Sequence, residues 1–463
     1  MNAAKLNVDI EKRFMALDRA KFLRACKPSK TLVFANPEDQ KYYIDFASVR
    51  GSEIIEELKG NITDFFDEPT CALFTGHIGC GKSTELLRLK AELDHEGFHV
   101  IYFESDRDLE MADVDIGDVL LSIARRITES LEKIQLTPQA TGFRGLLDAT
   151  KRVLLTEIDV KGTASVLGGK VGVDSSKKEV SLSAGIAELT MTAKNDPTLR
   201  EKLNQFLGPQ KNRLLESINQ ELIEPAIAKL QQVGKKGLVV IIDDLDRINN
   251  SQKPFGRSQQ EYLFVDQSEC LTSLHCHVVY TMPLALKFSL DYEMLKQRFE
   301  EPRMLPMVPV QYRDGSECAK GLDLLRQMIL ARAFPELSAE ERLSRVTEVF
   351  DSADSLDRLC RNSGGHVRDL LRLLSQWINR GKQLPLAGEV LDKLIRSSRN
   401  DMVMTISKEE WELLRQVYQS QGVGRDPAYQ NLIRRRLVFE YRDDEGSWFD
   451  VNPILIGANE LQV

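Results

Sequence analysis

Short apolar runs alternate with amphipathic stretches throughout residues 1–310. Four runs have the length and the β-branched or aromatic residues of buried strands: Cys71–Phe74, Phe98–Phe103, Leu238–Ile242 and His277–Thr281. Apolar residues recur at helical spacing in Gly51–Phe66, Ser83–Asp94 and Val114–Glu132. Strands that alternate with helices predict an α/β fold, with a parallel sheet covered by helices on both faces.

The pattern changes at three places along the chain. Glycines and short alternating segments mark residues 161–194, which predicts a β-hairpin or a flexible insertion; a surface loop and an interaction element fit equally well. Residues 311–398 have a helical pattern and predict a helical lid domain. Residues 399–463 are mixed and form the third expected domain, after a core over 1–310.

The last domain has the outline of a winged helix. Ser407 and Glu410 have capping-box spacing at the start of a helix over Lys408–Tyr418. A second helix and a two-stranded hairpin follow, over Tyr429–Leu437, Val438–Tyr441 and Trp448–Val451. Arg434, Arg435 and Arg436 fall on the second helix, where a DNA-reading helix would present its charges, although a packing role is equally compatible.

Composition narrows the class of protein. A chain of 463 residues with 42% hydrophobic and 29% charged residues is expected to fold into two or three domains. A net charge of −8 argues against a protein that coats nucleic acid, but leaves a local basic patch possible. No apolar run approaches the ~20 residues that span a bilayer, so no membrane association is expected. The seven cysteines include no Cys-x-x-Cys pair, which favours a cytoplasmic location without disulfides or a zinc site.

The strongest chemical signal is a glycine-rich loop between a predicted strand and a predicted helix. Its residues are Gly76, His77, Ile78, Gly79, Cys80, Gly81, Lys82 and Ser83, followed by Thr84. Backbone N–H groups in such a loop, with the positive end of the next helix, bind polyphosphate. We expect these nine residues to bind ATP, with Lys82 reaching the β- and γ-phosphates and Ser83 ligating Mg²⁺.

Two further strands end in polar residues. Leu238–Ile242 leads into Asp243 and Asp244, the arrangement of a Walker B strand. Asp243 is expected to hold Mg²⁺, and Asp244 to orient or deprotonate the attacking water. Alone, this run also fits a strand that ends at a helix cap; the phosphate loop upstream favours the catalytic interpretation. Thr281, at the end of the next strand, is a candidate sensor of the γ-phosphate, or simply a residue that fits a strand end.

Arginines supply the remaining candidates. Gly364 and Gly365 open a helix that carries Arg368 in its first turn, from which Arg368 could reach a nucleotide; a solvated arginine is the alternative. Arg298 or Arg303 could act as an arginine finger on the γ-phosphate of a neighbouring subunit, although arginines in mixed-charge stretches are usually solvated.

Together these motifs resemble the AAA+/STAND group of P-loop ATPases. The run from Asp243 to Ile248 is similar to the Walker B region of STAND and KAP-type ATPases. The order of core, lid and winged helix resembles origin-recognition ATPases and NACHT/NB-ARC switch proteins, over residues 45–457. Asp244 stands where many AAA+ enzymes have Glu, which leaves the hydrolysis rate open. No repeat array or nuclease, TIR or protease signature is recognised, so the expected output is another polypeptide.

The resemblance implies a mechanism. ATP binds at the junction of core and lid, Thr281 and Arg368 read the γ-phosphate, and the lid and winged helix rotate as the protein forms a homo-oligomer. Proteins of this type often act beside a partner effector, including in prokaryotic antiphage defence. The alternatives are a DNA-associated, origin-recognition-like ATPase and a small-molecule kinase; the acidic net charge favours the switch over the DNA-binding protein.

Overall fold

The computed structural model describes residues 17–51, 53–136, 140–155, 181–424 and 427–462. The chain divides into two compact units. The first unit comprises residues up to Ile54, Gly76–Arg88 and Met304 onward; the second comprises Ile55–Thr75 and Leu89–Arg303. Each unit is described separately below.

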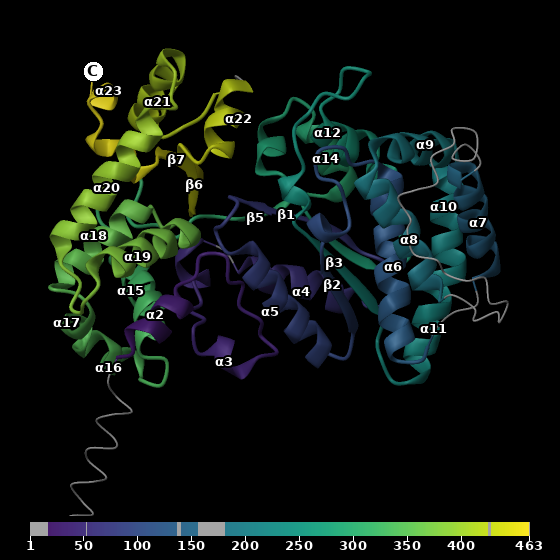
Figure 1. The fold of residues 1–463 in the computed structure, drawn as a ribbon, viewed down its shortest axis with the longest axis horizontal. Helices are drawn as coiled ribbons and strands as arrows, with labels where there is room; N and C mark the ends of the chain where they lie inside the picture. The colour runs from purple at the N-terminus through teal and green to yellow at the C-terminus, as the bar shows by residue number, and fades with distance from the viewer. Residues whose placement is uncertain (1–16, 52, 137–139, 156–180, 425–426, 463) are drawn as a thin grey trace, which may run out of the picture. The chain divides into compact units, whose positions relative to one another are not determined.

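A sheet of order β2-β3-β4-β1-β5 forms the centre of the α/β fold (Figure 1). Its strands are β1 Cys71–Gly76, β2 His99–Glu104, β3 Leu238–Asp243, β4 His277–Thr281 and β5 Arg303–Leu305. The pairs β2·β3, β3·β4 and β1·β4 are parallel. Every residue of β3 and β4 is buried, which explains their continuous apolar runs. The predicted α/β fold with a parallel sheet is confirmed.

Helices of the second unit pack beside this sheet, and α6, α8, α10 and α11 lie side by side (Figure 1). The helices that follow β1 and β2 in this unit are α6 Ile116–Lys133, α7 Thr141–Leu155, α8 Leu182–Asn195, α9 Pro197–Leu207, α10 Lys211–Ile218 and α11 Glu224–Gln232. Shorter helices follow β3 and β4: α12 Gln259–Glu261, α13 Ser268–Thr272 and α14 Tyr292–Phe299. Among the described residues of both units, no helix is long and apolar enough to cross a membrane.

A β-hairpin was one expectation for residues 161–194, and for residues 181–194, which the structure describes, this prediction is wrong. Leu182–Asn195 forms α8, capped by the Ser181 side chain, which accepts from the N–H of Ala184. Ile186, Leu189 and Ala193 are buried at helical spacing and outweigh the short alternation around Ser181. The earlier part of this expected insertion lies outside the described residues.

Two helices cross from one unit's residues into the other's. The helix α4 spans Ile54–Asp64, and α5 spans Lys82–His95. The first turns of α5, up to Arg88, belong to the first unit together with the glycine-rich loop before them. The loop is therefore grouped with the C-terminal part of the chain.

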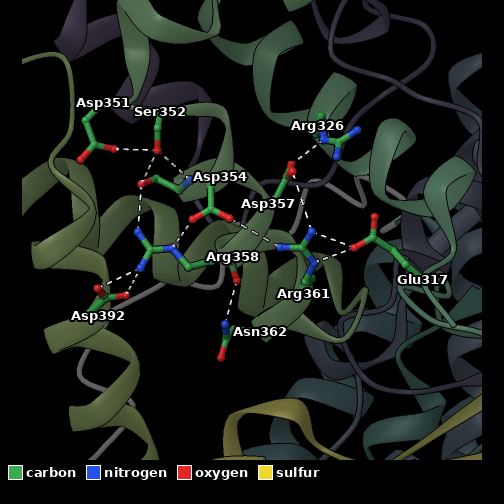
Figure 2. Close-up of polar contacts among 11 residues, drawn as sticks. Glu317, Arg326, Asp351, Ser352, Asp354, Asp357, Arg358, Arg361, Asn362 and Asp392 are labelled. Atoms are coloured by element: carbon green, nitrogen blue, oxygen red, sulfur yellow. Dashed lines mark hydrogen bonds and ion pairs between the residues drawn. The ribbon is translucent and has the colours of Figure 1, made fainter. Parts of the chain in front are cut away.

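Helices dominate the first unit, as predicted for residues 311–398. They are α2 Arg19–Ala25, α3 Pro37–Gln40, α15 Ala319–Ala333, α16 Ala339–Ser344, α17 Val346–Val349, α18 Ala353–Ser363, α19 Val367–Gly381 and α20 Gly388–Val403. Figure 2 shows how α18 is tied to its neighbours by charged side chains. Asp357 accepts from Arg326 of α15 at 2.6 Å, and Arg358 donates to Asp392 of α20 at 2.7 Å.

The C-terminal residues form α21 Lys408–Ser420, α22 Pro427–Arg434, the antiparallel strands β6 Val438–Asp443 and β7 Gly446–Val451, and α23 Asn459–Gln462. The capping box of Ser407 and Glu410 is confirmed, as is the hairpin. Tyr441 and Trp448 stack across the two strands, with ring centroids 4.6 Å apart. The winged-helix assignment itself stays a prediction.

The second of these helices is shorter than expected. It ends at Arg434, so the placement of Arg435 and Arg436 on it is wrong. Arg436 has φ 60°, and the N–H of Leu437 bonds to the carbonyl of Leu432 at 2.9 Å. This is a Schellman ending with an arginine where glycine is usual, and for that reason the sequence gives no stop signal.

Candidate nucleotide-binding site

The phosphate loop, residues 76–83, joins β1 to α5 in the predicted strand-loop-helix order. Gly79 and Gly81 have φ values of 99° and 115°, which side-chain-bearing residues rarely adopt. A Cβ on Gly79 would lie 2.8 Å from Cε1 of His366 and 2.9 Å from Cβ of Arg368. Glycine is thus needed at this position both for the turn and for the close approach of α19.

Phosphate binding by such a loop uses a lysine at the start of the helix, and Lys82 occupies that position on α5. Its side chain is buried, and Nζ donates to the carbonyls of Gly76 at 2.8 Å and His77 at 3.0 Å. Ser83 and Thr84 are half-buried on the first turn of the helix, and Cys80 is fully buried. The nucleotide-binding role of these residues stays a prediction.

The C-terminal part of the first unit holds the phosphate loop by three hydrogen bonds. The backbone N–H of Arg368 donates to the carbonyl of Gly79 at 3.1 Å. Nε2 of His366 donates to the carbonyl of Ile78 at 3.0 Å. The backbone N–H of Glu440, on β6, donates to Nε2 of His77 at 3.0 Å. The sequence predicted that the Arg368 side chain reaches the nucleotide; it did not predict these bonds to the loop from the Arg368 backbone, His366 and β6.

A chain of polar contacts continues from His366 to the turn before β6. Nδ1 of His366 lies 3.1 Å from a carboxylate oxygen of Asp369, and Nη1 of Arg436 lies 3.1 Å from the other. Burial would raise the pKa of Asp369, but His366, Arg436 and Arg372 hold it well below its usual range. The Asp369 carboxylate is therefore ionised and connects α19 to the hairpin.

Residues upstream of the loop also contact it, and no motif marks them. Nη2 of Arg50 donates to the carbonyl of Cys80 at 2.8 Å. The hydroxyl of Tyr43 lies 3.3 Å from both carboxylate oxygens of Glu85, on the first turn of α5. Burial raises the pKa of Glu85, against the attraction of Arg50 and Arg88. Arg50 is the functional candidate that sequence reasoning missed.

In the second unit, acidic side chains gather at the end of β3. Asp243 is buried and accepts from the hydroxyl of Tyr102 at 2.8 Å and from the N–H of Asp244 at 2.7 Å. Asp244 has left-handed backbone angles, φ 65° and ψ 2°, and its carboxylate lies 2.9 Å from Nη2 of Arg247. Burial, reinforced by the charge of Asp243, raises the pKa of Asp244 to about 7.

This acidic group fits a divalent cation. Carboxylate oxygens of Asp243, Asp244 and Asp246 lie within 4.8 Å of one another, and all three residues are buried. Oxygen ligands of this kind suit Mg²⁺, and a cation would relieve the repulsion that raises the Asp244 pKa. Of these three residues, the sequence predicted Asp243 alone as a ligand and not Asp246, which lies three residues after it. The metal-binding role of Asp243 and Ser83 stays a prediction.

The candidate sensor Thr281 is buried, whereas the candidate finger residues Arg298 and Arg303 are exposed and partly exposed. Thr281 is fully buried at the end of β4, and its hydroxyl donates to the carbonyl of Ile242 at 3.3 Å. Arg298 is exposed on α14, and Arg303 lies 3.6 Å from Glu57 in an ion pair. None of these contacts tests the predicted contact with a γ-phosphate.

All three arginines of the run at 434–436 have polar contacts within the protein. Arg435 contacts the carboxylate of Glu410 and donates to the carbonyl of Thr405 at 2.6 Å. Arg436 is held by Asp369, whereas Arg434 is exposed and donates to Oδ1 of Asn431 at 3.0 Å. These contacts favour the packing interpretation of the run over the DNA-reading one.

No protein-family model matches the chain, and no curated protein matches it in sequence. Among solved structures, the chain is similar to Cdc6p from Pyrobaculum aerophilum, with 11% identity and a TM-score of 0.38, covering 96% of this chain and 98% of that one. The ORC2 protein of Aeropyrum pernix, solved as ADPNP–ADP complexes, has 11% identity and a TM-score of 0.39, with coverage of 88% and 91%. The ORC1 protein of Aeropyrum pernix, solved in complex with DNA, has 14% identity and a TM-score of 0.33, with coverage of 88% and 91%.

At such identities and TM-scores, the fold of this chain is established by its own strand order.

Proposed function

We propose that this chain binds and hydrolyses MgATP and acts as a nucleotide-controlled switch. The phosphate loop would hold the polyphosphate through its backbone N–H groups and Lys82. Asp243 and Ser83 would hold Mg²⁺, which neutralises charge on the phosphates when bound. Asp244 would orient the attacking water, and Thr281 and Arg368 would respond to the γ-phosphate.

The observation that carries this proposal is the set of three bonds from C-terminal residues to the phosphate loop. His77, Ile78 and Gly79 each bond to an element that follows residue 360: β6, the His366 side chain or the start of α19. A ligand that favours one loop conformation therefore also favours one arrangement of these elements. A compact kinase has no need for such a connection, whereas a switch requires it.

Lys82 adds to this picture. Its ammonium group donates to two carbonyls of the loop itself, at Gly76 and His77. Phosphate oxygens are stronger acceptors for an ammonium group than carbonyls are. We therefore expect Lys82 to leave these carbonyls when nucleotide binds, which changes the loop next to His77 and the bond from β6.

The output of the switch is proposed from the resemblance. The protein would form homo-oligomers in its ATP state and act on a separate effector protein, with antiphage defence as one setting. Sizing the protein with and without a non-hydrolysable ATP analogue tests the first part. An unchanged size at saturating analogue would contradict oligomer formation by this route.

Retention of isotope-labelled ATP tests the site assignment. We expect Lys82→Ala to abolish binding, because it removes the cation that meets the β- and γ-phosphates. We expect Asp244→Ala to keep binding and trap ATP, because it removes the residue that acts on water. Tight retention by Lys82→Ala would contradict the assignment, as would rapid hydrolysis by Asp244→Ala.

The alternative function is an ATPase that binds DNA through its C-terminal domain. The internal contacts of Arg435 and Arg436 favour the switch, because they occupy the charges that would meet phosphates. Arg434 is the exposed member of the run. Salt-sensitive DNA binding that is lost in Arg434→Ala would support the alternative.

A further inference from the structure

Arg50 is a buried arginine that lies against the phosphate loop. It follows a short helical turn at Ala47–Val49 and is only 3% exposed. Its guanidinium lies over the ring of Phe46, 5.3 Å from the centroid. Nη2 donates to the carbonyl of Cys80, inside the loop, at 2.8 Å. The contact joins residues thirty positions apart, so no local sequence pattern predicts it.

Burial of the Arg50 side chain has an unfavourable free energy. A buried cation loses its hydration, and Nε of Arg50 has no hydrogen-bond partner among the residues that the structure describes. Glu85 is an acidic neighbour, whose pKa is raised by burial, and the charge of Arg50 opposes that shift. A neutral side chain over Phe46 would fill this space at lower cost. We therefore infer that the role of Arg50 depends on its hydrogen bond to the Cys80 carbonyl.

The geometry of the peptide bond gives that contact a consequence. In a trans peptide the carbonyl and the next N–H point in opposite directions. A bond that holds the Cys80 carbonyl toward Arg50 therefore directs the N–H of Gly81 away from it. Gly81 has φ 115°, and as glycine it could adopt the reversed peptide orientation with little strain. Something outside the loop must select one orientation.

The Gly81 N–H is available to a ligand. Within the part of the chain that the structure describes, this N–H donates to no protein acceptor, whereas the N–H groups of Thr84 and Glu85 bond to the Gly81 carbonyl. Backbone N–H groups at this point of a phosphate loop, just before the helix, are those that bind phosphate oxygens.

We propose that Arg50 is a positioning residue that holds the Cys80–Gly81 peptide with its N–H directed toward the nucleotide phosphates. Arg50 does not itself touch the nucleotide in this account. The inference rests on the proposed function, because it requires that the loop bind a polyphosphate.

Arg332 provides a matched control in the same unit. It is similarly buried, lies over the ring of Tyr42, and donates to the carbonyl of Met328 at 2.7 Å. Its partners are not in the phosphate loop. Arg332→Met should therefore lose stability as Arg50→Met does, without a change in nucleotide affinity.

The experiment measures the Kd of MgADP by calorimetry and the ³¹P shift of the bound β-phosphate. We expect Arg50→Met to weaken MgADP binding by roughly 10- to 100-fold, the equivalent of one hydrogen bond to a charged group. The β-phosphate resonance should move, because one of its donors is displaced. Arg50→Lys keeps a charged donor of different reach, so it should show a smaller loss and a shift in the same direction.

The outcomes separate the two claims. Unchanged affinity and ³¹P shift in the Arg50 variants, with binding lost in Lys82→Ala, would overturn the positioning role and leave nucleotide binding intact. Failure of the unaltered protein to bind MgADP would overturn the proposed function itself. If Arg50→Met does not fold, Arg50→Lys carries the test, and values equal to those of the unaltered protein overturn the proposal. An equal loss of affinity in Arg332→Met would show a general effect of lost stability and also overturn it.

Discussion

Replacement of Asp369 by Asn removes the charge that connects α19 to the hairpin. The Asp369 carboxylate lies 3.1 Å from His366, 3.1 Å from Arg436 and 3.2 Å from Arg372. Asn keeps the shape of the side chain but cannot balance the two arginines. The substitution thus tests whether this carboxylate stabilises the C-terminal elements around the loop.

The expected change in the free energy of unfolding follows from how exposed Asp369 and its arginine partners are. Removal of one member of a fully buried ion pair costs about 3–5 kcal/mol, and exposed pairs contribute about 0.2–1 kcal/mol. The Asp369 side chain is 7% exposed, whereas those of Arg436 and Arg372 are 33% and 43% exposed. Solvent therefore screens part of each attraction, and we expect Asp369→Asn to lower the free energy of unfolding by about 2 kcal/mol.

Tryptophan fluorescence during urea unfolding is a suitable assay. The chain has three tryptophans, and all belong to the first unit: Trp377, Trp411 and Trp448. Their emission reports on this unit separately from the second, which matters because a chain of two units need not unfold in one step. A double-mutant cycle with Arg436→Met should give a coupling energy of about 1 kcal/mol.

Asp357→Asn is the matched control. Asp357 accepts from Arg326 at 2.6 Å and is also partly buried, and it links α18 to α15, with Arg326 and Arg361 as its ion-pair partners (Figure 2). It should lose stability without changing MgADP affinity, whereas Asp369→Asn should change both. A loss below about 0.5 kcal/mol in Asp369→Asn, or a cycle with no coupling, would refute the reasoning.

Three further predictions concern single residues. Burial raises the pKa of Asp450 to about 6, so the unfolding free energy should fall as pH rises from about 4 through 6. Asp450→Asn should abolish this slope, which amounts to about 2 kcal/mol over that pH range. A pH series of urea titrations measures the slope, and an unchanged slope in the variant would contradict the prediction. Gly365→Ala places a Cβ 1.8 Å from the carbonyl oxygen of Val308. The substitution should lower the free energy of unfolding by more than about 3 kcal/mol in the same assay. A decrease below about 1 kcal/mol would contradict the backbone contact. Asp243→Asn should raise the Mg²⁺ concentration for half-maximal hydrolysis at least roughly tenfold, and an unaltered Mg²⁺ dependence would exclude Asp243 as a ligand.

The sequence predicted the sheet well because buried parallel strands carry continuous apolar runs. Leu238–Asp243 and His277–Thr281 need no long-range information to be recognised, since each contains a continuous apolar run with polar residues beside it. The glycines of the phosphate loop are recognisable for a similar reason, because the chemistry of phosphate binding sets their spacing locally. Strand and loop thus followed from short windows of sequence.

Features that depend on distant residues could not be predicted in this way. The bond between Arg50 and Cys80, and that between Glu440 and His77, join positions with no common local pattern. The early end of α22 depends on Arg436 adopting a conformation that its residue type disfavours, while its side chain reaches Asp369. Tertiary contacts override local propensity at such positions.

Hydrogen exchange of β6 tests the central claim most directly. The N–H of Glu440, on this strand, donates to His77 of the phosphate loop, so its exchange reports on the connection between nucleotide and hairpin. We predict that peptides over Val438–Asp443 exchange at different rates in the nucleotide-free, ADP and non-hydrolysable ATP analogue states, and that Lys82→Ala abolishes these differences. Nucleotide binding with identical exchange of β6 in all three states would contradict the account.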